Sequence, residues 1–200
     1  MRQKIGIGLV LLGIMTIAFY FVYQKGLEVK NNNEVENYIE NTKIQEEAEV
    51  PTEEPKEEIN KKNYEINYTA VLEIPSINLK RGVVDNTKGF RSINYAISVD
   101  RSSNYPNEMG NFILYAHSGS STIGYFNKLT NVSLNDDIYV YYNGTKYHYT
   151  IYDKYDIEKT GKAKVITAKD KKYITLITCN QKRKGYQIVI IGKLVEESSY

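Results

Sequence analysis

The sequence predicts a mostly β domain preceded by a single membrane-spanning helix. An uncharged, mostly apolar run extends from Ile5 to Tyr23 near the N-terminus. From about residue 60 onward, short runs of β-branched and aromatic residues alternate with turn signals, and helical periodicity is scarce. Several short strands with little helix favour a β-barrel or a β-sandwich.

The apolar N-terminal run has the length of a membrane span. At about 1.5 Å per residue it reaches about 28 Å, close to the roughly 30 Å hydrocarbon core of a bilayer. Arg2 and Lys4 precede the run, Tyr20 and Tyr23 end it, and no small-residue cleavage site follows. We therefore expect residues 1–24 to be an uncleaved signal anchor. Its N-terminal tip would be cytoplasmic and the rest of the chain extracellular.

Residues 25–59 are expected to form an acidic, flexible stalk. Ten glutamates lie between Glu34 and Glu58, together with two prolines. Such a segment buries too little apolar surface to offset the entropy lost on ordering. A short helix around residues 35–48 is the alternative, although isolated helices of this length are marginal in water.

Residues 60–200 are long enough for one domain with a single core. They hold twenty basic and thirteen acidic side chains, and the basic ones are scattered. No basic helix or aromatic-interleaved motif predicts a nucleic-acid partner. An extracellular surface near anionic lipids or wall polymers is the simpler expectation.

Six strands and two short helices can be assigned in this domain. The strands are expected over residues 71–75, 112–116, 138–142, 146–153, 174–178 and 187–194. Asn143-Gly144 predicts a tight hairpin between the third and fourth of them. The helices are expected over residues 89–94 and 122–129.

Two strand ends carry complementary chemistry. Cys179 is the only cysteine and stands where the strand 174–178 gives way to a polar loop, and His117 holds the same kind of position after the strand 112–116. A nucleophilic thiol needs a partner that raises its thiolate fraction and returns a proton to the leaving group, and histidine does both near neutral pH. The pair predicts a cysteine transferase or hydrolase. A buried cysteine that acts as a small hydrophobe is the plain alternative.

The other histidine, His148, is not expected to take part. It lies within the alternating Tyr-rich run 146–150, where the pattern places it on a solvent-facing side of its strand.

Four segments, in order along the chain, resemble the sortases of Gram-positive bacteria. They are residues 72–79 (LEIPSINL), residues 110–117 (GNFILYAH), the spacing of Phe126, Leu129 and Asp137, and residues 175–179 (TLITC). The resemblance covers about residues 64–195 and suggests a small class B-like or D-like member. It implies a closed eight-stranded sortase-type β-barrel over a catalytic domain of residues 60–200.

The resemblance also implies a membrane-anchored cysteine transpeptidase. Enzymes of that family cleave a sorting signal similar to Leu-Pro-x-Thr-Gly through an acyl-thioester and pass the chain to an amine of the cell wall or of a pilin. Carried over, Cys179 is the nucleophile and His117 the general acid, with Ala116 and Thr178 beside the substrate. The implied partners are secreted proteins that bear the signal, the amine acceptor and the membrane. No cofactor or metal is expected, because the thioester conserves the reactivity of the acyl group.

One position departs from the family pattern. The strand after the cysteine usually begins with an arginine, and Gln187 stands there instead. Arg183 lies four residues earlier, in the preceding loop. A guanidinium gives a stronger charge-assisted hydrogen bond than an amide, so Arg183 is the favoured contact to the substrate carbonyl and Gln187 the alternative.

Two other functions stay open at this stage. A sortase-like hydrolase would release the peptide to water and would differ from a transpeptidase only in the acceptor. A catalytically silent barrel that acts as a surface binding module is the alternative outside enzymes. The missing arginine favours the silent barrel, whereas the retained Cys179 and His117 argue against it.

Overall fold

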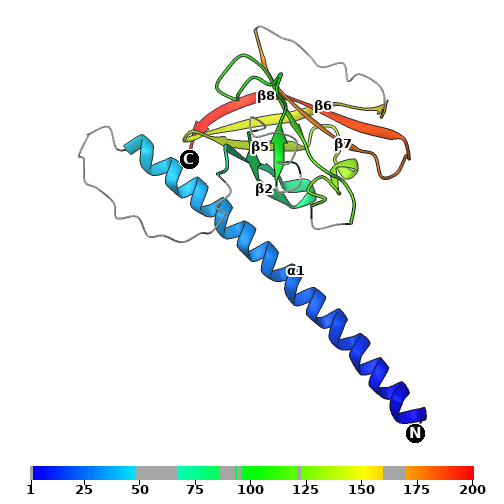
Figure 1. The fold of residues 1–200 in the computed structure, drawn as a ribbon. Coiled ribbons are helices and arrows are strands. Elements are labelled where there is room, and N and C mark those ends of the chain that lie inside the picture. The colour runs from blue at the N-terminus through cyan, green and yellow to red at the C-terminus, as the bar shows by residue number, and fades with distance from the viewer. Residues whose placement is uncertain (1, 48–66, 86–92, 94–95, 121–122, 160–169) are drawn as a thin grey trace.

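The structure, a computed structural model, describes residues 2–47, 67–85, 93, 96–120, 123–159 and 170–200, and shows one long helix beside a β-barrel (Figure 1). Helix α1 covers Arg2–Glu47. The strands are β1 (Ala70–Ile74), β2 (Leu79–Val84), β3 (Ile97–Val99), β4 (Gly110–Tyr115), β5 (Asp137–Tyr142), β6 (Thr145–Glu158), β7 (Lys172–Cys179) and β8 (Tyr186–Ser199). Two short 3-10 helices, η1 (Pro75–Ile77) and η4 (Leu129–Asn131), complete the described elements.

The eight strands close into a barrel in the order β1-β2-β3-β4-β7-β8-β6-β5, and β5 pairs back with β1. This confirms the predicted mostly β, closed-barrel fold class. Most neighbours are antiparallel, but β2 and β3 run parallel to each other, and so do β4 and β7. Parallel neighbours end at the same edge of a sheet, so the residues that follow β4 and β7 meet there.

The barrel core consists of alternate residues from each strand. On β4, β7 and β8 the inward positions carry apolar side chains that belong to one buried cluster: Phe112, Leu114, Ile174, Leu176, Ile188 and Ile190. Because side chains alternate across a strand, the residues between these positions face outward. This parity decides which strand-end residues can meet a substrate.

The six predicted strands are all present, several of them longer than expected. The hairpin is confirmed as well, since Asn143 (φ 46°) and Gly144 (φ 74°) both adopt the left-handed conformation that a tight hairpin turn requires. Strands β2 and β3 were not predicted. The first interrupts its apolar pattern with a polar pair and a glycine, and the second is only three residues long.

The expected helix over residues 122–129 is wrong within the described part of that segment, which forms turns that lead into η4. Gly124 packs against the carbonyl of Gly119 so closely that a Cβ atom would lie 2.3 Å from that oxygen. A backbone contact of this kind requires glycine and a turn. Apart from residue 93, the helix expected over 89–94 lies outside the described residues.

Residues 25–47 are helical and do not form the expected flexible stalk, because they continue α1. The second half of α1 packs against β1 and β2. Val35 is only 2% exposed. The Tyr38 hydroxyl donates to the carbonyl of Thr69 at 2.6 Å, and the hydroxyls of Thr42 and Tyr200 lie 2.6 Å apart. Contact with the barrel supplies the stabilisation that an isolated helix lacks. The rest of the stalk, residues 48–59, lies outside the described residues.

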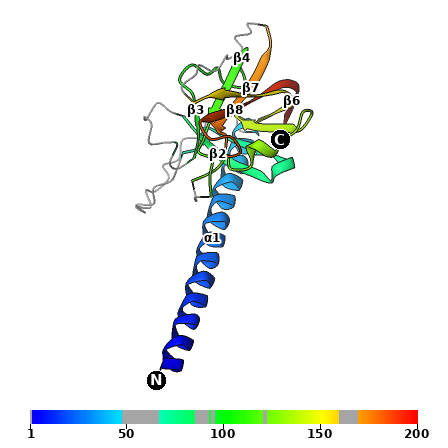
Figure 2. The same ribbon diagram turned by 90° about the vertical axis from the view of Figure 1, so that its right-hand side faces the viewer.

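The first half of α1 projects away from the barrel toward the N-terminus (Figure 2). Among the described residues, α1 is the one helix long and apolar enough to cross a membrane, and its most apolar window has a mean hydropathy of 2.1.

The barrel core contains a buried hydroxyl that the fold does not satisfy. The side chain of Tyr149 is fully buried, and its Oη has no hydrogen-bond partner among the described residues. Burial raises the pKa of this phenol, so it stays protonated. We expect Tyr149→Phe to stabilise the barrel by about 1 kcal/mol, because it removes an unsatisfied polar group at nearly constant volume. Urea unfolding monitored by near-UV circular dichroism measures this difference. A lower midpoint of unfolding in the variant than in the parent would contradict the expectation.

Candidate active site

The ends of β4 and β7 bring His117 and Cys179 side by side. The register of the parallel pair places Tyr115 opposite Ile177. Continued for two residues beyond β4, this register puts His117 opposite Cys179. The pairing continues beyond the strand end, because the amide of Ala116 donates to the carbonyl of Ile177 at 3.4 Å. Alternation puts both His117 and Cys179 on the outward face, where each is half-buried.

Ala116 and Thr178 stand next to His117 and Cys179 at the two strand ends, with their side chains buried, and their contact with the substrate stays a prediction. Their side chains are 4% and 2% exposed. The Thr178 hydroxyl donates to the carbonyl of Ala116 at 2.8 Å and so ties the two strand ends together.

Ser118 joins the two halves of the site and was missed by the sequence analysis. Its hydroxyl donates to the carbonyl of Cys179 at 2.7 Å. The amide of Phe126 donates to the carbonyl of His117 at 2.9 Å, so the backbone of the histidine is held as well. A hydroxyl directly after a histidine at a strand end was the available signal.

Gln187 lies on the same face as Cys179. The two residues are direct partners in the antiparallel pair of β7 and β8. Direct partners in a sheet project to the same face. The amide of Asn180 donates to the carbonyl of Tyr186 at 2.8 Å, so Asn180 and Tyr186 are a hydrogen-bonded pair. Because hydrogen-bonded and non-hydrogen-bonded pairs alternate, Cys179 and Gln187 form a closely spaced non-hydrogen-bonded pair.

Arg183 is held elsewhere. Its Nη1 lies 3.7 Å from a carboxylate oxygen of Asp156, and its guanidinium carbon lies 3.4 Å from the ring centroid of Tyr186. Tyr186 and Gln187 are consecutive on β8 and therefore face opposite sides of the sheet. The structure thus brings Gln187, and not Arg183, to the face of Cys179, and the sequence-based preference for Arg183 gains no support from this placement.

His148 lies far from the site. It pairs with Glu196 on β8, nine residues beyond Gln187, which corresponds to about 30 Å along a strand. Its Nε2 lies 2.7 Å from Oδ1 of Asp137, and its side chain is 23% exposed. It faces outward and is partly covered by this carboxylate.

No metal-ligand group was found in the part of the chain that the structure describes: no three His, Cys, Asp or Glu side chains are arranged there to hold an ion. Cys179, His117 and Gln187 bring a thiol, an imidazole and a side-chain amide to one face. A nucleophile, a proton donor and a hydrogen-bond donor in this arrangement suit acyl transfer.

The chain and its fold are similar to known proteins. The model of the sortase domain matches residues 72–195. Among solved structures, the sortase D5 transpeptidase of Clostridium perfringens shares 17% identity and a TM-score of 0.58 over 65% of this chain and 80% of its own. Sortase A of Listeria monocytogenes shares 22% identity and a TM-score of 0.59, over 66% of this chain and 90% of its own. Sortase C-1 of Actinomyces oris shares 21% identity and a TM-score of 0.59, over 64% of this chain and 74% of its own.

These likenesses show a shared fold. They span three sortase classes, so the class B-like or D-like assignment stays a prediction. No curated protein sequence matches the chain.

The placement of Gln187 and Arg183 can be checked by cross-linking. Cα atoms of a non-hydrogen-bonded antiparallel pair are about 4.5 Å apart, within the range of a disulfide. We expect oxidised Gln187→Cys to form a disulfide with Cys179, seen as the loss of both free thiols in intact mass spectrometry. Arg183→Cys is the matched control and should keep both thiols. Efficient cross-linking of Arg183→Cys instead would show that the loop lies over Cys179.

Proposed function

The chain belongs to the sortase family, and from this premise we propose that it is a membrane-anchored cysteine transpeptidase. The observation that carries the proposal is the position of Cys179 and His117 at the adjacent ends of two parallel strands, on one outward face. The substrates are secreted proteins with a sorting signal similar to Leu-Pro-x-Thr-Gly. The acceptor is an amine of a cell-wall precursor or of a pilin.

The reaction proceeds in two acyl transfers. The sulfur of Cys179 attacks the threonine carbonyl carbon of the signal, the C–N bond to the following residue breaks, and His117 gives a proton to the leaving amine. The acceptor amine then attacks the acyl-thioester on Cys179, His117 takes a proton from that amine, and the C–S bond breaks. The sulfur and the imidazole thereby return to the states they had before the first step. Two such steps have lower barriers than direct aminolysis of the amide.

Gln187 is the side chain best placed to bind the carbonyl oxygen of the substrate. It is the direct neighbour of Cys179 on β8, and its amide can donate to the charge that develops on the oxygen. A neutral amide gives a weaker hydrogen bond than a guanidinium does. Backbone amides near Cys179 would share this work.

The apolar half of α1 is the membrane anchor in this proposal. The described residues of the apolar window are fully outside the protein core, and burying such a surface in lipid is strongly favourable. Basic residues at the N-terminal tip favour a cytoplasmic N-terminus. We place the anchor at residues 1–24, the segment that connects it to the barrel at residues 25–59, and the extracellular catalytic domain at residues 60–200.

The test of the proposed function is the product formed from a fluorogenic sorting peptide. With an added amine we expect cleavage and a new peptide–amine conjugate, separated by chromatography, and Cys179→Ala should give neither. Cleavage without a conjugate at any amine concentration would favour the hydrolase. No cleavage of any sorting peptide by the intact chain would favour a silent binding module.

The two histidines make a matched pair of variants. We expect His117→Ala to lower the turnover of the peptide by about 100-fold to 10,000-fold, the usual effect of losing a general acid and base. The turnover of His148→Ala should stay close to that of the parent, because His148 lies on β6 opposite Glu196, far from Gln187 along β8. A larger loss in His148→Ala than in His117→Ala would refute the assignment of the general acid.

Gln187 and Arg183 form a second pair. If Gln187 binds the carbonyl oxygen, Gln187→Ala should slow acylation by about 100-fold, the effect of removing one such donor, and Arg183→Ala should have little effect. Single-turnover kinetics in rapid-quench experiments measure this step. The reverse ranking would mean that the loop of Arg183 reorganises when substrate binds, and equal small losses would leave the role to backbone amides.

A further inference from the structure

The apolar half of α1 sets the height of the barrel above the bilayer. Every large apolar side chain from Ile7 to Tyr23 is more than half exposed in the chain itself. If this segment is the anchor, as the proposed function holds, lipid must cover these side chains up to Tyr23. The end of the hydrocarbon layer is thereby fixed along the helix.

Two cavities lie between α1 and the barrel at this same level. The larger, of about 780 Å³, is lined by Phe21 and Tyr23 of α1 and by Ile123 and Tyr125 of the barrel. The smaller, of about 290 Å³, brings Tyr20 of α1 close to Ile77, Ser120 and Lys128. Parts of the barrel therefore lie beside helix residues that are expected to be in lipid.

The headgroup layer is thick enough to reach these barrel residues. It extends roughly 5 to 8 Å beyond the hydrocarbon on each side, and a helix rises about 1.5 Å per residue. Residues 24–28 of α1 therefore cross this layer, and both Gln24 and Glu28 line the two cavities together with Arg81. Headgroups must meet the barrel at this surface.

The charge of the two cavities favours anionic headgroups. Four basic side chains line them, against two carboxylates: Lys25, Lys30, Arg81 and Lys128, with Glu28 and Glu34. One of the carboxylates is already engaged, because Glu34 accepts a hydrogen bond from the Tyr68 hydroxyl at 2.9 Å and lies 3.7 Å from Nζ of Lys30.

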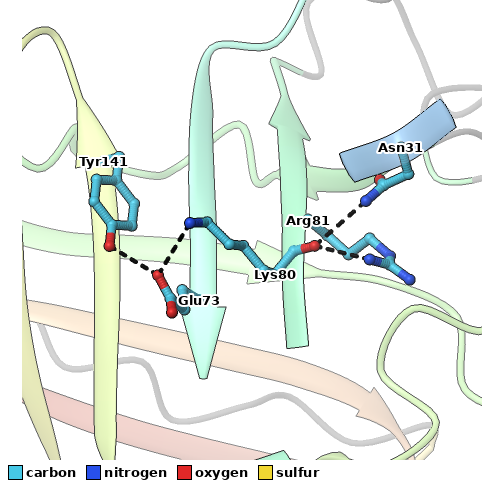
Figure 3. Close-up of polar contacts among 5 residues, drawn as sticks. All are labelled: Asn31, Glu73, Lys80, Arg81 and Tyr141. Atoms are coloured by element: carbon cyan, nitrogen blue, oxygen red, sulfur yellow. Dashed lines mark hydrogen bonds and ion pairs between the residues drawn. The ribbon is translucent and has the colours of Figure 1, made fainter. Parts of the chain in front are cut away.

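Arg81 is the best-placed cation. Its Nη1 donates to the carbonyl of Lys80 at 2.9 Å, and no carboxylate of the described residues lies within ion-pair distance of it. Figure 3 shows its guanidinium on the side of α1 near Asn31, whereas the ammonium of Lys80 points to Glu73. A guanidinium offers a planar set of donors that matches a phosphate group.

We propose that the surface formed by Ile77, Arg81, Ser120, Ile123, Tyr125 and Lys128, the membrane-facing surface, rests on the outer leaflet and binds the phosphate groups of anionic lipids. Arg81 is the main phosphate ligand. This surface adjoins the active site, because the amide of Phe126, next to Tyr125, donates to the carbonyl of His117 at 2.9 Å. Contact with lipid on this surface therefore holds the active site at a fixed height above the bilayer.

Fluorescence quenching in vesicles tests the orientation. A bimane label is placed on one introduced cysteine at a time in full-length Cys179→Ala protein, reconstituted in phosphatidylcholine with phosphatidylglycerol. Ser120→Cys reports on the membrane-facing surface, and Ser198→Cys is the matched exposed control. Ser198 is two residues from Tyr200, whose hydroxyl is hydrogen-bonded to that of Thr42 on α1. Thr42 lies about 28 Å beyond Tyr23 along the helix, so the control label is far from the bilayer. Met15→Cys reports on the anchor.

We expect headgroup-nitroxide lipids to quench the Ser120 label at least threefold more than the Ser198 label, and acyl-chain nitroxides to quench the Met15 label. Equal quenching at Ser120 and Ser198, with Met15 still quenched, would overturn this inference and leave the proposed function intact. An unquenched Met15 label would show that this segment is not in the hydrocarbon layer, which would overturn both the anchor and this inference.

A second arm tests the recognition of anionic lipid. Adding phosphatidylglycerol to phosphatidylcholine vesicles should increase the headgroup quenching at Ser120 at low salt. Arg81→Gln should abolish this increase, and Arg101→Gln, which changes an exposed arginine outside the two cavities, should keep it. An increase that survives in Arg81→Gln, or no increase in the parent, would overturn the assignment of Arg81 as a phosphate ligand.

Discussion

The parallel pairing of β4 with β7 is the constraint on which the candidate site depends. Parallel neighbours must end at one edge of a sheet, so the pairing of the strands by itself brings the residues that follow them together. A buried hydrogen bond of 3.0 Å from Thr175 to Asn111 joins the strands lower down, and Thr178 bonds the carbonyl of Ala116 near the top. The pairing of strands thus supplies the proximity on which acyl transfer relies.

Strand β8 adds the third group by a different rule. Its antiparallel pairing with β7 puts Gln187 on the face of Cys179. Arg183 is attracted in another direction, because Asp156 offers a charge and Tyr186 an aromatic face to stack on. The site therefore combines a thiol and an imidazole with a neutral donor. Stabilisation of the oxyanion would then depend more on backbone amides than it would beside a guanidinium.

Much of the fold and the site was predictable because it rests on local signals. The strand ends at Cys179 and His117 are visible in the sequence as apolar runs followed by polar residues, and Asn143-Gly144 is a strong hairpin signal by itself. The features missed depend on tertiary contacts. Val35 is buried only because the barrel lies beside it, and the position of Arg183 is set by a partner 27 residues away in the chain.

The central claim is that Cys179 carries the acyl group, and intact mass spectrometry tests it most directly. The full-length chain is mixed with a sorting peptide in the absence of amine, quenched in acid and weighed. The account predicts a mass increase equal to the N-terminal fragment of the peptide, located on Cys179 by fragmentation and removed by hydroxylamine, as a thioester requires. Cleavage of the peptide with an unmodified Cys179, or an adduct on another residue, would contradict it.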